Sequence, residues 1–504
     1  MPDIKIEKVD ESFVRILTED FGILQEVQEE FSFLVPGHQW MPKFKCGMWD
    51  GKLRLLNMRN RTLPSGLLYK LLDFCKNRKY SIEVDDALVD VDIATPEQKH
   101  LLSYFDTLNI SDSKGKRIQP HDYQIEGVCH ALENYKSILK SPTASGKSLM
   151  IYLMSRYFME QVSGTQQILV IVPTVSLVSQ MYGDFHDYSL NDSTFNVTEQ
   201  SVHTIQGGRS KDSNAPIVIS TWQSIFKQPK SWFAKFGMVV GDEAHQYKAQ
   251  SLSKIMEHLG NAWIRVGTTG TIPDDAPVNK LVLEGHFGPV YNVITTKKLM
   301  DRGNIAQLNI HSLVLKYSAD ERKAFGGMPY KDEIDYIVSN KARNRFIRKL
   351  ALSLKGNTLV LFNYVQKHGI PLHADITKHA KDGRKVFFVS GGTAADDREA
   401  CRRIVEGETD AIINASLGVF STGVNIKNIH NIIFAAPTKS QIRVLQSIGR
   451  GLRKSDNGKA TTLYDIVDDL SYGKRKNYAL KHGIERSKIY LKEKFSTKSV
   501  IIDI

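Results

Sequence analysis

The stretch Ser141-Pro-Thr-Ala-Ser-Gly-Lys-Ser148 decides the fold expected for this 504-residue chain. It matches the phosphate loop G-x-x-x-x-G-K-[ST] except at its first position, where Ser141 replaces glycine. An apolar segment precedes the loop, and the apolar run 149–154 follows it. This context is typical of the strand–loop–helix unit in which backbone N–H groups at a helix N-terminus surround phosphates.

Each position of the loop has a predicted role. Lys147 is expected to reach the β- and γ-phosphates of ATP, and Ser148 is expected to place its hydroxyl on Mg²⁺. The backbone that curls around the phosphates belongs to Thr143, Ala144, Ser145 and Gly146. A Gly-Lys-Ser turn that arises by chance is the alternative, and the flanking apolar segments count against it.

A pair of carboxylates follows another apolar segment. Gly241-Asp-Glu-Ala-His245 comes directly after residues 238–240, which are typical of a buried strand. An aspartate at the carboxyl end of such a strand can hold Mg²⁺, so Asp242 is a predicted metal and catalytic residue. Glu243 is the predicted general base for the attacking water. A solvated strand end is the alternative, but the phosphate loop upstream favours the catalytic interpretation.

Short apolar, β-branched segments alternate with amphipathic segments over most of the chain. Segments typical of buried parallel strands are 168–172, 217–220, 238–240, 264–267, 358–362, 385–389, 411–415, 431–434 and 461–466. Segments 149–160 and 174–185 are typical of the helices that connect such strands. The alternation predicts an α/β fold: two tandem doubly wound parallel-sheet domains, preceded by a small α+β N-terminal domain.

Charge is unevenly distributed along the chain. Residues 1–110 carry 14 basic and 18 acidic side chains, residues 111–300 carry 18 and 16, and residues 301–504 carry 35 and 21. The net charge of +12 therefore comes from the last two-fifths of the sequence. This excess indicates that the C-terminal part faces a polyanion. The small polar stretch 111–117 and a turn-rich stretch near 295–304 are the expected linkers.

The acidic box and the phosphate loop, in this order, resemble those of superfamily 2 helicases and translocases. Residues 117–124 (RIQPHDYQ) resemble the adenine-recognising segment of these enzymes. The resemblance implies that Gln124 bonds the adenine edge and that Arg117 lies against the base. Residues 173–180 (PTVSLVSQ), 220–224 (STWQS) and 269–271 (TGT) resemble motifs Ia, Ib and III. The nucleic-acid contacts that this implies are Thr174, Gln180, Thr221, Trp222 and Gln223.

Matching segments continue in the second half of the chain. Residues 359–365 (LVLFNYV), 389–393 (VSGGT), 420–426 (FSTGVNI) and 446–453 (QSIGRGLR) resemble motif IV, the segment before motif V, motif V and motif VI. The resemblance implies that Asn363 and Thr422 contact nucleic acid, that Gly423 and Asn425 contact nucleotide, and that Gln446, Arg450 and Arg453 are catalytic. Arginines three residues apart share a helix face, so both can stabilise charge on the transferred phosphoryl group. We therefore expect ATP·Mg²⁺ to bind between the two α/β domains.

The resemblance is closest to the UvsW helicases of T-even bacteriophages. The segments that support it are 42–56 (PKFKCGMWDGKLRLL), 63–67 (LPSGL), 236–240 (FGMVV), 418–423 (GVFSTG) and 480–484 (LKHGI). It covers essentially the whole chain and implies two RecA-like domains and ATP-dependent DNA helicase activity on branched DNA. R-loops, Holliday junctions and stalled forks are the implied substrates, in recombination, repair and replication control. Recombination and replication proteins are implied partners, and the oligomeric state stays open.

This resemblance predicts the domain organisation. We expect an accessory, DNA-binding domain at 1–110, an ATP-binding RecA-like domain at 111–297, and a second RecA-like domain with a basic helical tail at 298–504. The first domain mixes aromatic and basic residues: Trp40, Trp49, Lys43, Lys45, Lys52 and Arg54. They form either an edge that meets DNA or a small core with Trp49 buried and lysines solvated. An RNA-directed helicase and a motor subunit of a restriction or remodelling complex are the alternative functions.

The cysteine and hydropathy patterns argue against several classes of protein. The cysteines Cys46, Cys75, Cys129 and Cys401 lie far apart, which argues against a zinc site or a disulfide framework. The N-terminal residues lack the apolar core of a signal peptide, and no apolar run approaches the ~20 residues that span a bilayer. We expect a soluble, cytoplasmic protein without a membrane partner, in the host cytoplasm if a phage encodes it.

Overall fold

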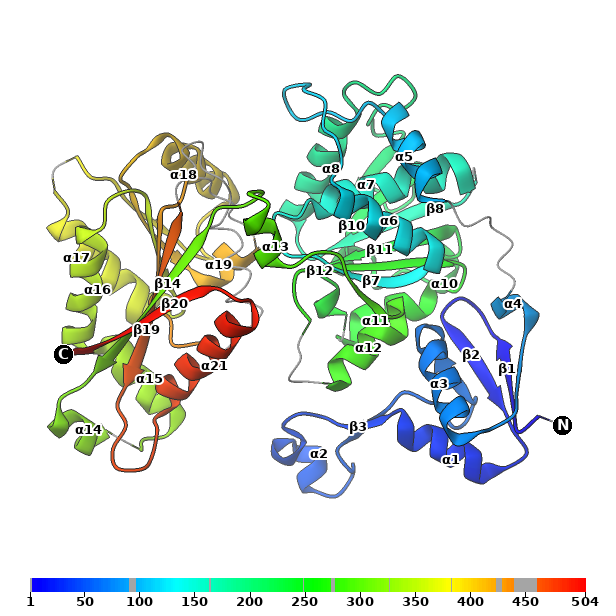
Figure 1. The fold of residues 1–504 in the computed structure, drawn as a ribbon, viewed down its shortest axis with the longest axis horizontal. Coiled ribbons are helices and arrows are strands. Elements are labelled where there is room, and N and C mark those ends of the chain that lie inside the picture. The colour runs from blue at the N-terminus through cyan, green and yellow to red at the C-terminus, as the bar shows by residue number, and fades with distance from the viewer. Residues whose placement is uncertain are drawn as a thin grey trace. The chain divides into compact units, whose positions relative to one another are not determined.

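The structure is a computed structural model that describes residues 2–89, 97–162, 165–247, 249–272, 277–325, 327–381, 383–422, 428–438 and 460–504. Two compact units make up the chain. The first comprises Met1–Ser141 and Ser145–Val293, and the second comprises Pro142–Ala144 and Ile294–Ile504. Each unit contains one seven-stranded parallel sheet, which confirms the predicted pair of doubly wound α/β domains (Figure 1).

The first unit begins with a small α+β module, also as predicted. Its sheet has the order β5-β2-β1-β6 and mixes antiparallel and parallel pairs. Apolar side chains of two helices pack against this sheet, and Leu281 from later in the chain joins the core that they form. The strands are β1 (Ile4–Lys8), β2 (Phe13–Leu17), β5 (Thr62–Pro64) and β6 (Ile82–Val84), and the helices are α1 (Phe21–Glu30) and α3 (Leu68–Arg78).

The first large sheet has the strand order β13-β7-β12-β11-β8-β10-β9. Its central strands are buried on both faces, as their continuous apolar composition predicts. The strands are β7 (Lys136–Lys140), β8 (Gln167–Val172), β9 (Val202–Ile205), β10 (Ile217–Thr221), β11 (Phe236–Asp242), β12 (Ile264–Thr269) and β13 (Val290–Asn292). The four strands predicted in this region are present, and β9 and β13 were not predicted.

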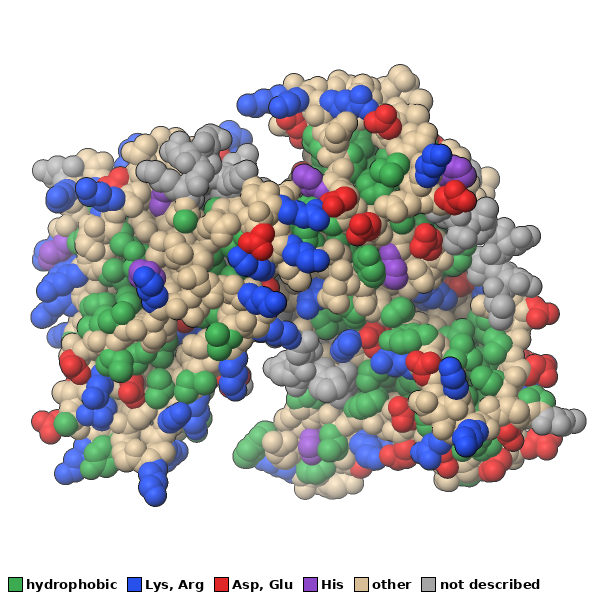
Figure 2. All heavy atoms as spheres, viewed as in Figure 1, with side chains coloured by type: hydrophobic (Ala, Val, Ile, Leu, Met, Phe, Trp, Pro, Cys, Tyr) green, Lys and Arg blue, Asp and Glu red, His purple; other side chains and the backbone are tan. Residues whose placement is uncertain are grey.

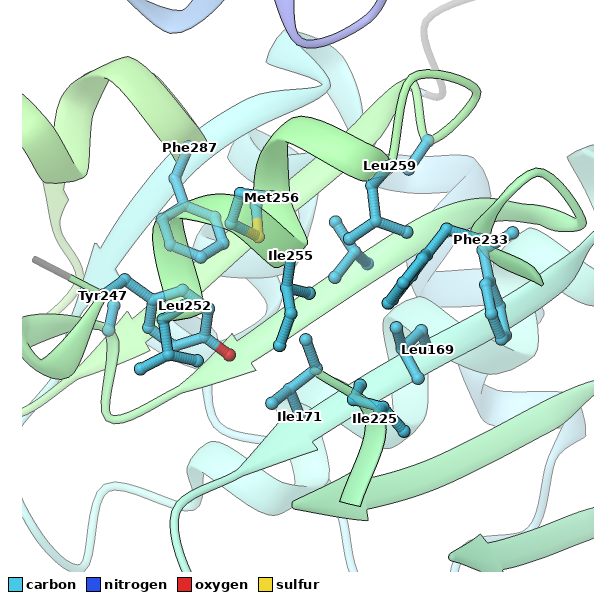
Figure 3. Packing of buried hydrophobic residues seen from close by; sticks show 14 of the residues in the cluster. Leu169, Ile171, Ile225, Phe233, Tyr247, Leu252, Ile255, Met256, Leu259 and Phe287 are labelled. Atoms are coloured by element: carbon cyan, nitrogen blue, oxygen red, sulfur yellow. The ribbon is translucent and has the colours of Figure 1, made fainter. Parts of the chain in front are cut away.

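Helices flank this sheet and connect its strands. They are α5 (Gln98–Thr107), α6 (Asp122–Asn134), α7 (Lys147–Tyr157), α8 (Val175–Ser189), α9 (Trp222–Ile225), α10 (Lys230–Phe233), α11 (Gln250–His258) and α12 (Pro277–Phe287). α11 illustrates why they pack: Leu252, Ile255 and Met256 recur at helical spacing and face apolar residues such as Leu169 and Ile171 of β8 (Figure 3). The same cluster includes Phe236 and Val239 of β11, the strand whose end carries predicted site residues.

Partly buried polar contacts join the N-terminal module to the first α/β domain. Arg265 on β12 donates to the carbonyl oxygen of Glu11 over 2.8 Å, and Lys136 on β7 donates to the Glu11 carboxylate over 3.1 Å. Gly66 lies so close to α12 that an added Cβ would come within 2.1 Å of the Glu284 carbonyl oxygen. The module and the domain therefore form a single compact unit.

The second unit has a sheet of order β16-β17-β15-β18-β19-β14-β20, again all parallel. Its strands are β14 (Leu308–Lys316), β15 (Thr358–Phe362), β16 (Val386–Val389), β17 (Ile412–Ser416), β18 (Asn431–Phe434), β19 (Thr461–Asp469) and β20 (Ser496–Asp503). Its helices include α14 (Ala319–Phe325), α15 (Tyr330–Ser339), α16 (Lys341–Ser353), α17 (Ile370–His379), α18 (Ala395–Gly407), α19 (Leu417–Thr422) and α21 (Tyr478–Lys492).

Three stretches differ from the expectations. The basic tail is helical only in α21, because β20 joins the sheet as an edge strand beside β14. The stretch 111–117 forms a turn closed by a bridge between Ser111 and Arg117, since its polar residues hydrogen-bond one another. The stretch near 295–304 contains the helix α13 (Thr296–Asp301), which Thr295 caps by accepting from the Lys298 N–H over 3.2 Å. The division into three domains at 110 and 297 stays a prediction.

Candidate active site

The predicted site residues of the first unit lie at one edge of its sheet. Since the strands are parallel, their carboxyl ends share this edge. The phosphate loop follows β7, the acidic box ends β11, and motif III ends β12, which lies between those two strands. Asp242 is the register partner of Thr268, and Thr269 is the partner of Lys140. The strand order thus brings three motifs together that are far apart in sequence.

The phosphate loop turns through two left-handed residues before α7 begins. Ala144 has φ +66° and Gly146, the N-cap of α7, has φ +79°. An added Cβ at Gly146 would lie 2.1 Å from Nε2 of Gln124. Glycine is therefore required here by backbone conformation and by close approach. Alternating right- and left-handed residues turn successive N–H groups to one side, which suits an anion.

The serine at the first loop position has a local explanation. Ser141 has no left-handed φ, so glycine is not required there. Its hydroxyl donates to the Ser145 hydroxyl over 2.6 Å, and its N–H donates to the Thr269 carbonyl oxygen over 2.8 Å. Its own carbonyl oxygen accepts from the Lys147 ammonium over 3.3 Å. The departure from the loop pattern thus adds one contact within the loop, the bond from Ser141 to Ser145, since the other two contacts use backbone atoms.

The predicted adenine-binding residues already make contacts within the protein. Gln124 is 4% exposed; its Nε2 donates to the Ser145 carbonyl oxygen over 2.9 Å, and its Oε1 accepts from the His121 N–H over 2.8 Å. Arg117 forms a 2.5 Å ion pair with Asp106 beside a cavity of about 410 Å³. The contacts to adenine stay predictions. The role of Gln124 in joining α6 to the phosphate loop was missed, because sequence spacing does not show which backbone atoms an amide reaches.

The acidic box combines burial, like charge and backbone strain. Asp242 accepts from the Thr268 hydroxyl over 2.8 Å. Burial raises the pKa of Asp242, the neighbouring Glu243 carboxylate raises it further, and Lys147 lowers it. Glu243 adopts φ 51° and ψ 51°, a left-handed conformation that costs a non-glycine residue about 1 kcal/mol or more. Such strain and such a pKa shift are concentrated at functional sites.

A histidine links the acidic box to motif III. His245 Nδ1 lies 3.3 Å from a carboxylate oxygen of Glu243 and 3.1 Å from the Thr269 hydroxyl. The Thr269 hydroxyl also lies 2.9 Å from the Thr271 carbonyl oxygen, to which it donates. A chain of contacts thus runs from Glu243 through His245 to Thr269, the last residue of β12. His245 was not among the predicted site residues, although its place in the box was visible in the sequence.

The side chains at this site suit Mg²⁺ that is bound together with nucleotide phosphates. Mg²⁺ prefers hard oxygen ligands and usually takes one or two carboxylates from a protein, with phosphate oxygens and water completing the shell. Ser148 offers a hydroxyl at the start of α7, and Asp242 offers a carboxylate. Within the described ranges, there is no group of three or more His, Cys, Asp or Glu side chains that could hold a metal by itself. The donor set is thus suited to a metal–nucleotide complex.

Ser148 has a hydrogen-bond partner that was not predicted. The hydroxyl of Ser148 lies 2.9 Å from the phenol oxygen of Tyr188 on α8. The Tyr188 ring is also 5.5 Å from that of Tyr152 on α7. Tyr188 is 40 residues from Ser148, so only the packing of α7 on α8 reveals this contact.

The predicted nucleic-acid contacts of the first unit follow β8 and β10. Thr174 caps α8 by accepting from the Leu177 N–H over 3.4 Å. Thr221 is buried, and its hydroxyl lies 2.9 Å from that of Ser224. Gln180 and Gln223 are exposed, and Trp222 is half-buried against Phe226. Thr174 and Gln180 come after β8, Thr221 ends β10, and Trp222 and Gln223 follow it on α9. Both strands lie beyond β11 from the phosphate loop, and the contacts of these residues with nucleic acid stay predictions.

Fewer of the predicted residues are described in the second unit. Asn363 directly follows β15 and is half-buried. Thr422 ends α19, and its side chain is not described. The predicted residues that lie outside the described ranges are Gly423, Asn425, Gln446, Arg450 and Arg453.

Comparison with known proteins identifies the family. The chain is 38% identical, over 511 aligned residues, to the ATP-dependent DNA helicase uvsW of Enterobacteria phage T4, and the alignment covers 98% of each protein. The chain belongs to the UvsW family of DNA helicases. A family model for the N-terminal region of the UvsW DNA helicase matches residues 3–85. The family confirms the predicted resemblance and the predicted class of enzyme.

Further matches agree with this UvsW-family assignment. A model of the type III restriction enzyme res subunit matches residues 117–274, and a conserved helicase C-terminal domain matches residues 342–455. The crystal structure of T4 UvsW is 36% identical, with a TM-score of 0.52 and 99% of each chain covered. A DNA 3′-5′ translocase, XPB2 of Sulfurisphaera tokodaii, is 24% identical over 70% of this chain and 82% of its own length.

Proposed function

We propose that this chain is an ATP-dependent DNA helicase or translocase that acts on branched DNA, including R-loops, Holliday junctions and stalled forks. The phosphate loop and the acidic box on one sheet edge carry the proposal. Membership of the UvsW family supports the choice of DNA, since the T4 relative is named as an ATP-dependent DNA helicase. Roles in recombination, repair and replication control, and partners from those processes, belong to the same proposal.

The phosphate loop and the acidic box bind and polarise the nucleotide in this proposal. The backbone of Thr143–Gly146 surrounds the phosphates, and the ammonium of Lys147 neutralises their charge. Ser148 and Asp242 hold Mg²⁺, which supplies Lewis-acid stabilisation of the phosphoryl group when bound. Glu243 accepts the proton of the attacking water. Its contact with His245, 3.3 Å away, relays the protonation state of Glu243 to Thr269.

Residues of the second half of the chain complete the proposed machinery. Gln446, Arg450 and Arg453 stabilise charge on the transferred phosphoryl group, and Gly423 and Asn425 contact the nucleotide. Asn363 and Thr422 contact the DNA backbone together with the residues that follow β8 and β10. Residues 301–504 carry 35 basic and 21 acidic side chains, and Figure 2 shows Lys and Arg over the visible face of the second unit. This charge supports phosphate contacts and a steep salt dependence of DNA binding.

The test compares the wild type with Lys147→Ala on a panel of substrates. Forks, Holliday junctions, R-loops, linear duplexes and RNA duplexes are offered with ATP and Mg²⁺. We expect unwinding of the branched DNAs and no ATP hydrolysis by Lys147→Ala, with DNA affinity within about twofold of wild type because the lysine touches nucleotide only. Wild-type hydrolysis by Lys147→Ala contradicts the assigned site, and failure of wild type on every branched DNA contradicts the substrate class.

The match of residues 117–274 to a restriction-enzyme motor favours one other function, a translocase that does not separate strands. Displacement of a bound third strand or protein from linear duplex, without unwinding of forks, would identify that activity. Preferential unwinding of RNA duplexes would instead identify an RNA-directed helicase.

A further inference from the structure

An ordered arm extends from the N-terminal module. It comprises residues 35–51 and connects β3 (Ser32–Leu34) to β4 (Lys52–Arg54), which pair antiparallel at its base. The arm carries the short helix α2 (Pro42–Lys45) and extends away from the sheet of β1 and β2 (Figure 1). Most of it contributes nothing to the core of the module, so the fold does not account for its apolar residues.

Contacts within the arm hold its shape. The Val35 N–H donates to the Gly51 carbonyl oxygen over 2.8 Å and closes the loop. The rings of His38 and Phe44 meet edge to face with centroids 4.7 Å apart. The indole N–H of Trp49 donates to the Lys52 carbonyl oxygen over 2.8 Å. The arm is therefore a built element, and Trp49 is one of its structural residues.

Two other apolar side chains of the arm face solvent. Trp40 is 73% exposed and Met48 is 82% exposed, which are the highest values among the exposed large hydrophobic residues of the described chain. Met41 is also exposed. Exposed large apolar side chains gathered on one short arm are typical of a binding surface. The two tryptophans that the sequence could not tell apart thus have different roles.

The charge of the arm indicates which kind of ligand it binds. The arm contains Lys43, Lys45 and one acidic residue, Asp50, which pairs with Arg54 at the base of the arm, on a module that is otherwise net negative. Within the described part of the chain, neither lysine forms an ion pair, whereas Lys52 pairs with Glu29 over 2.6 Å. The Lys45 ammonium lies 5.6 Å from the centroid of the Trp40 ring. A π-face beside uncompensated ammonium groups is complementary to a base next to a phosphate.

We propose that the arm binds DNA at the branch point, where Trp40 stacks on an open base face and Lys43 and Lys45 contact the adjacent phosphates. In a continuous duplex each base is covered on both faces by its neighbours. A branch point exposes a base face, so stacking by Trp40 discriminates branched DNA from linear duplex. The inference rests on the proposed function and adds the residues that select the substrate.

The test measures the affinity of the full chain for a fork and for a linear duplex of equal length by fluorescence anisotropy. Trp40→Ala is expected to weaken fork binding about tenfold, since stacking on one base contributes about 1–3 kcal/mol, and to change duplex binding less than twofold. The double variant Lys43→Gln/Lys45→Gln is expected to reduce the slope of log affinity against log salt by nearly two units on the fork.

Phe21→Ala is the matched control, because Phe21 is an aromatic residue of the same module that is 60% exposed but adjoins Asp20. It is expected to leave both affinities unchanged. Wild-type fork binding by Trp40→Ala, or equal losses on fork and duplex, overturns the inference and leaves the proposed helicase function standing. A changed sedimentation coefficient with unchanged fork affinity also overturns it, because the arm is then a contact between protein chains. Failure of wild type itself on forks contradicts the proposed function instead.

Discussion

The buried aspartates of the two parallel sheets differ in their charged partners. In the second unit, Asp465 lies 2.8 Å from Arg486, and Asp468 lies 2.7 Å from Arg343, and all four side chains are inaccessible to solvent. In the first unit, Asp242 ends a buried strand beside a second carboxylate and has no arginine within ion-pair distance among the described residues. Burial raises the pKa of both Asp242 and Asp465, but only Asp465 has a guanidinium that opposes the shift.

This difference distinguishes carboxylates that stabilise the fold from carboxylates that take part in catalysis. A buried aspartate held by arginine has its charge compensated within the fold, and it stabilises a single arrangement of strands and helices. At Asp242, burial and the neighbouring carboxylate outweigh the effect of Lys147, so full compensation of its charge needs a further cation, which a metal–nucleotide complex supplies. Asp192 in the first unit follows the structural pattern, since Arg156 contacts it directly and is itself fully buried. The distinction thus applies residue by residue.

The largest expected effect is the loss of ATP hydrolysis when Glu243 is replaced. Glu243→Gln removes the proposed general base while keeping size and hydrogen bonding, so ATP hydrolysis should fall about a thousandfold. Steady-state phosphate release with saturating DNA measures it. The counterpart in the second unit, Asp469→Asn, changes an acidic residue at the end of a strand without proposed chemistry and should leave the rate within about twofold of wild type. Similar losses in both variants would remove the distinction between the two sheets.

The next effect concerns stability. Arg486→Met leaves Asp465 buried without its partner and also removes a 2.7 Å bond to the Thr438 carbonyl oxygen, so unfolding should become easier by about 3–5 kcal/mol. Urea denaturation of the full chain measures the change. The control is Lys488→Met on the same helix, which loses an exposed ion pair with Glu485 and should change stability by less than about 1 kcal/mol. Adding Asp465→Leu to Arg486→Met should restore much of the loss; no recovery would show that the buried charge is not its cause.

A smaller change in stability is expected for Asp242→Asn, and it has the opposite sign: the variant should be more stable. Its pKa in the folded chain lies above the ordinary value of 3.8, so the charged form destabilises the fold at neutral pH. Asp242→Asn should therefore stabilise the protein by about 1 kcal/mol while abolishing ATP hydrolysis. The gain should be complete at a pH above the raised pKa, should fade as the pH falls through it, and should vanish below 3.8, where the wild-type carboxyl is protonated in both states. Thermal denaturation at several pH values tests this, and destabilisation at neutral pH would contradict it.

The smallest expected effect is at Tyr188. Tyr188→Phe removes the hydroxyl that lies 2.9 Å from Ser148, so Ser148 should be oriented less well towards Mg²⁺. The affinity for a fluorescent ATP analogue, titrated at several Mg²⁺ concentrations, should fall about threefold, as expected for one hydrogen bond. Without Mg²⁺ the two proteins should bind the analogue equally. Tyr182→Phe on the same helix is the control, and an equal loss in it would rule out a specific role for Tyr188.

The strands and the motif order were predictable because their signals are local. Continuous apolar segments such as 358–362 become buried strands, and the loop around Lys147 is followed by a helix, as its spacing requires. The strand β14 was missed because its residues alternate in burial, which is unusual within a parallel sheet covered on both faces. β20 was also missed, since its exposed, basic sequence resembles a tail and only pairing with β14 makes it a strand.

Local sequence therefore determined the fold class, the family resemblance and the positions of the phosphate loop and the acidic box. Tertiary structure alone decided which polar groups are partners: Gln124 with Ser145, Tyr188 with Ser148, and Arg486 with Asp465. It also decided that Trp49 is used within the arm while Trp40 is left exposed. The physical reason is that strand and helix formation depends on neighbouring residues, whereas burial and pairing depend on groups that the fold brings together from distant parts of the chain.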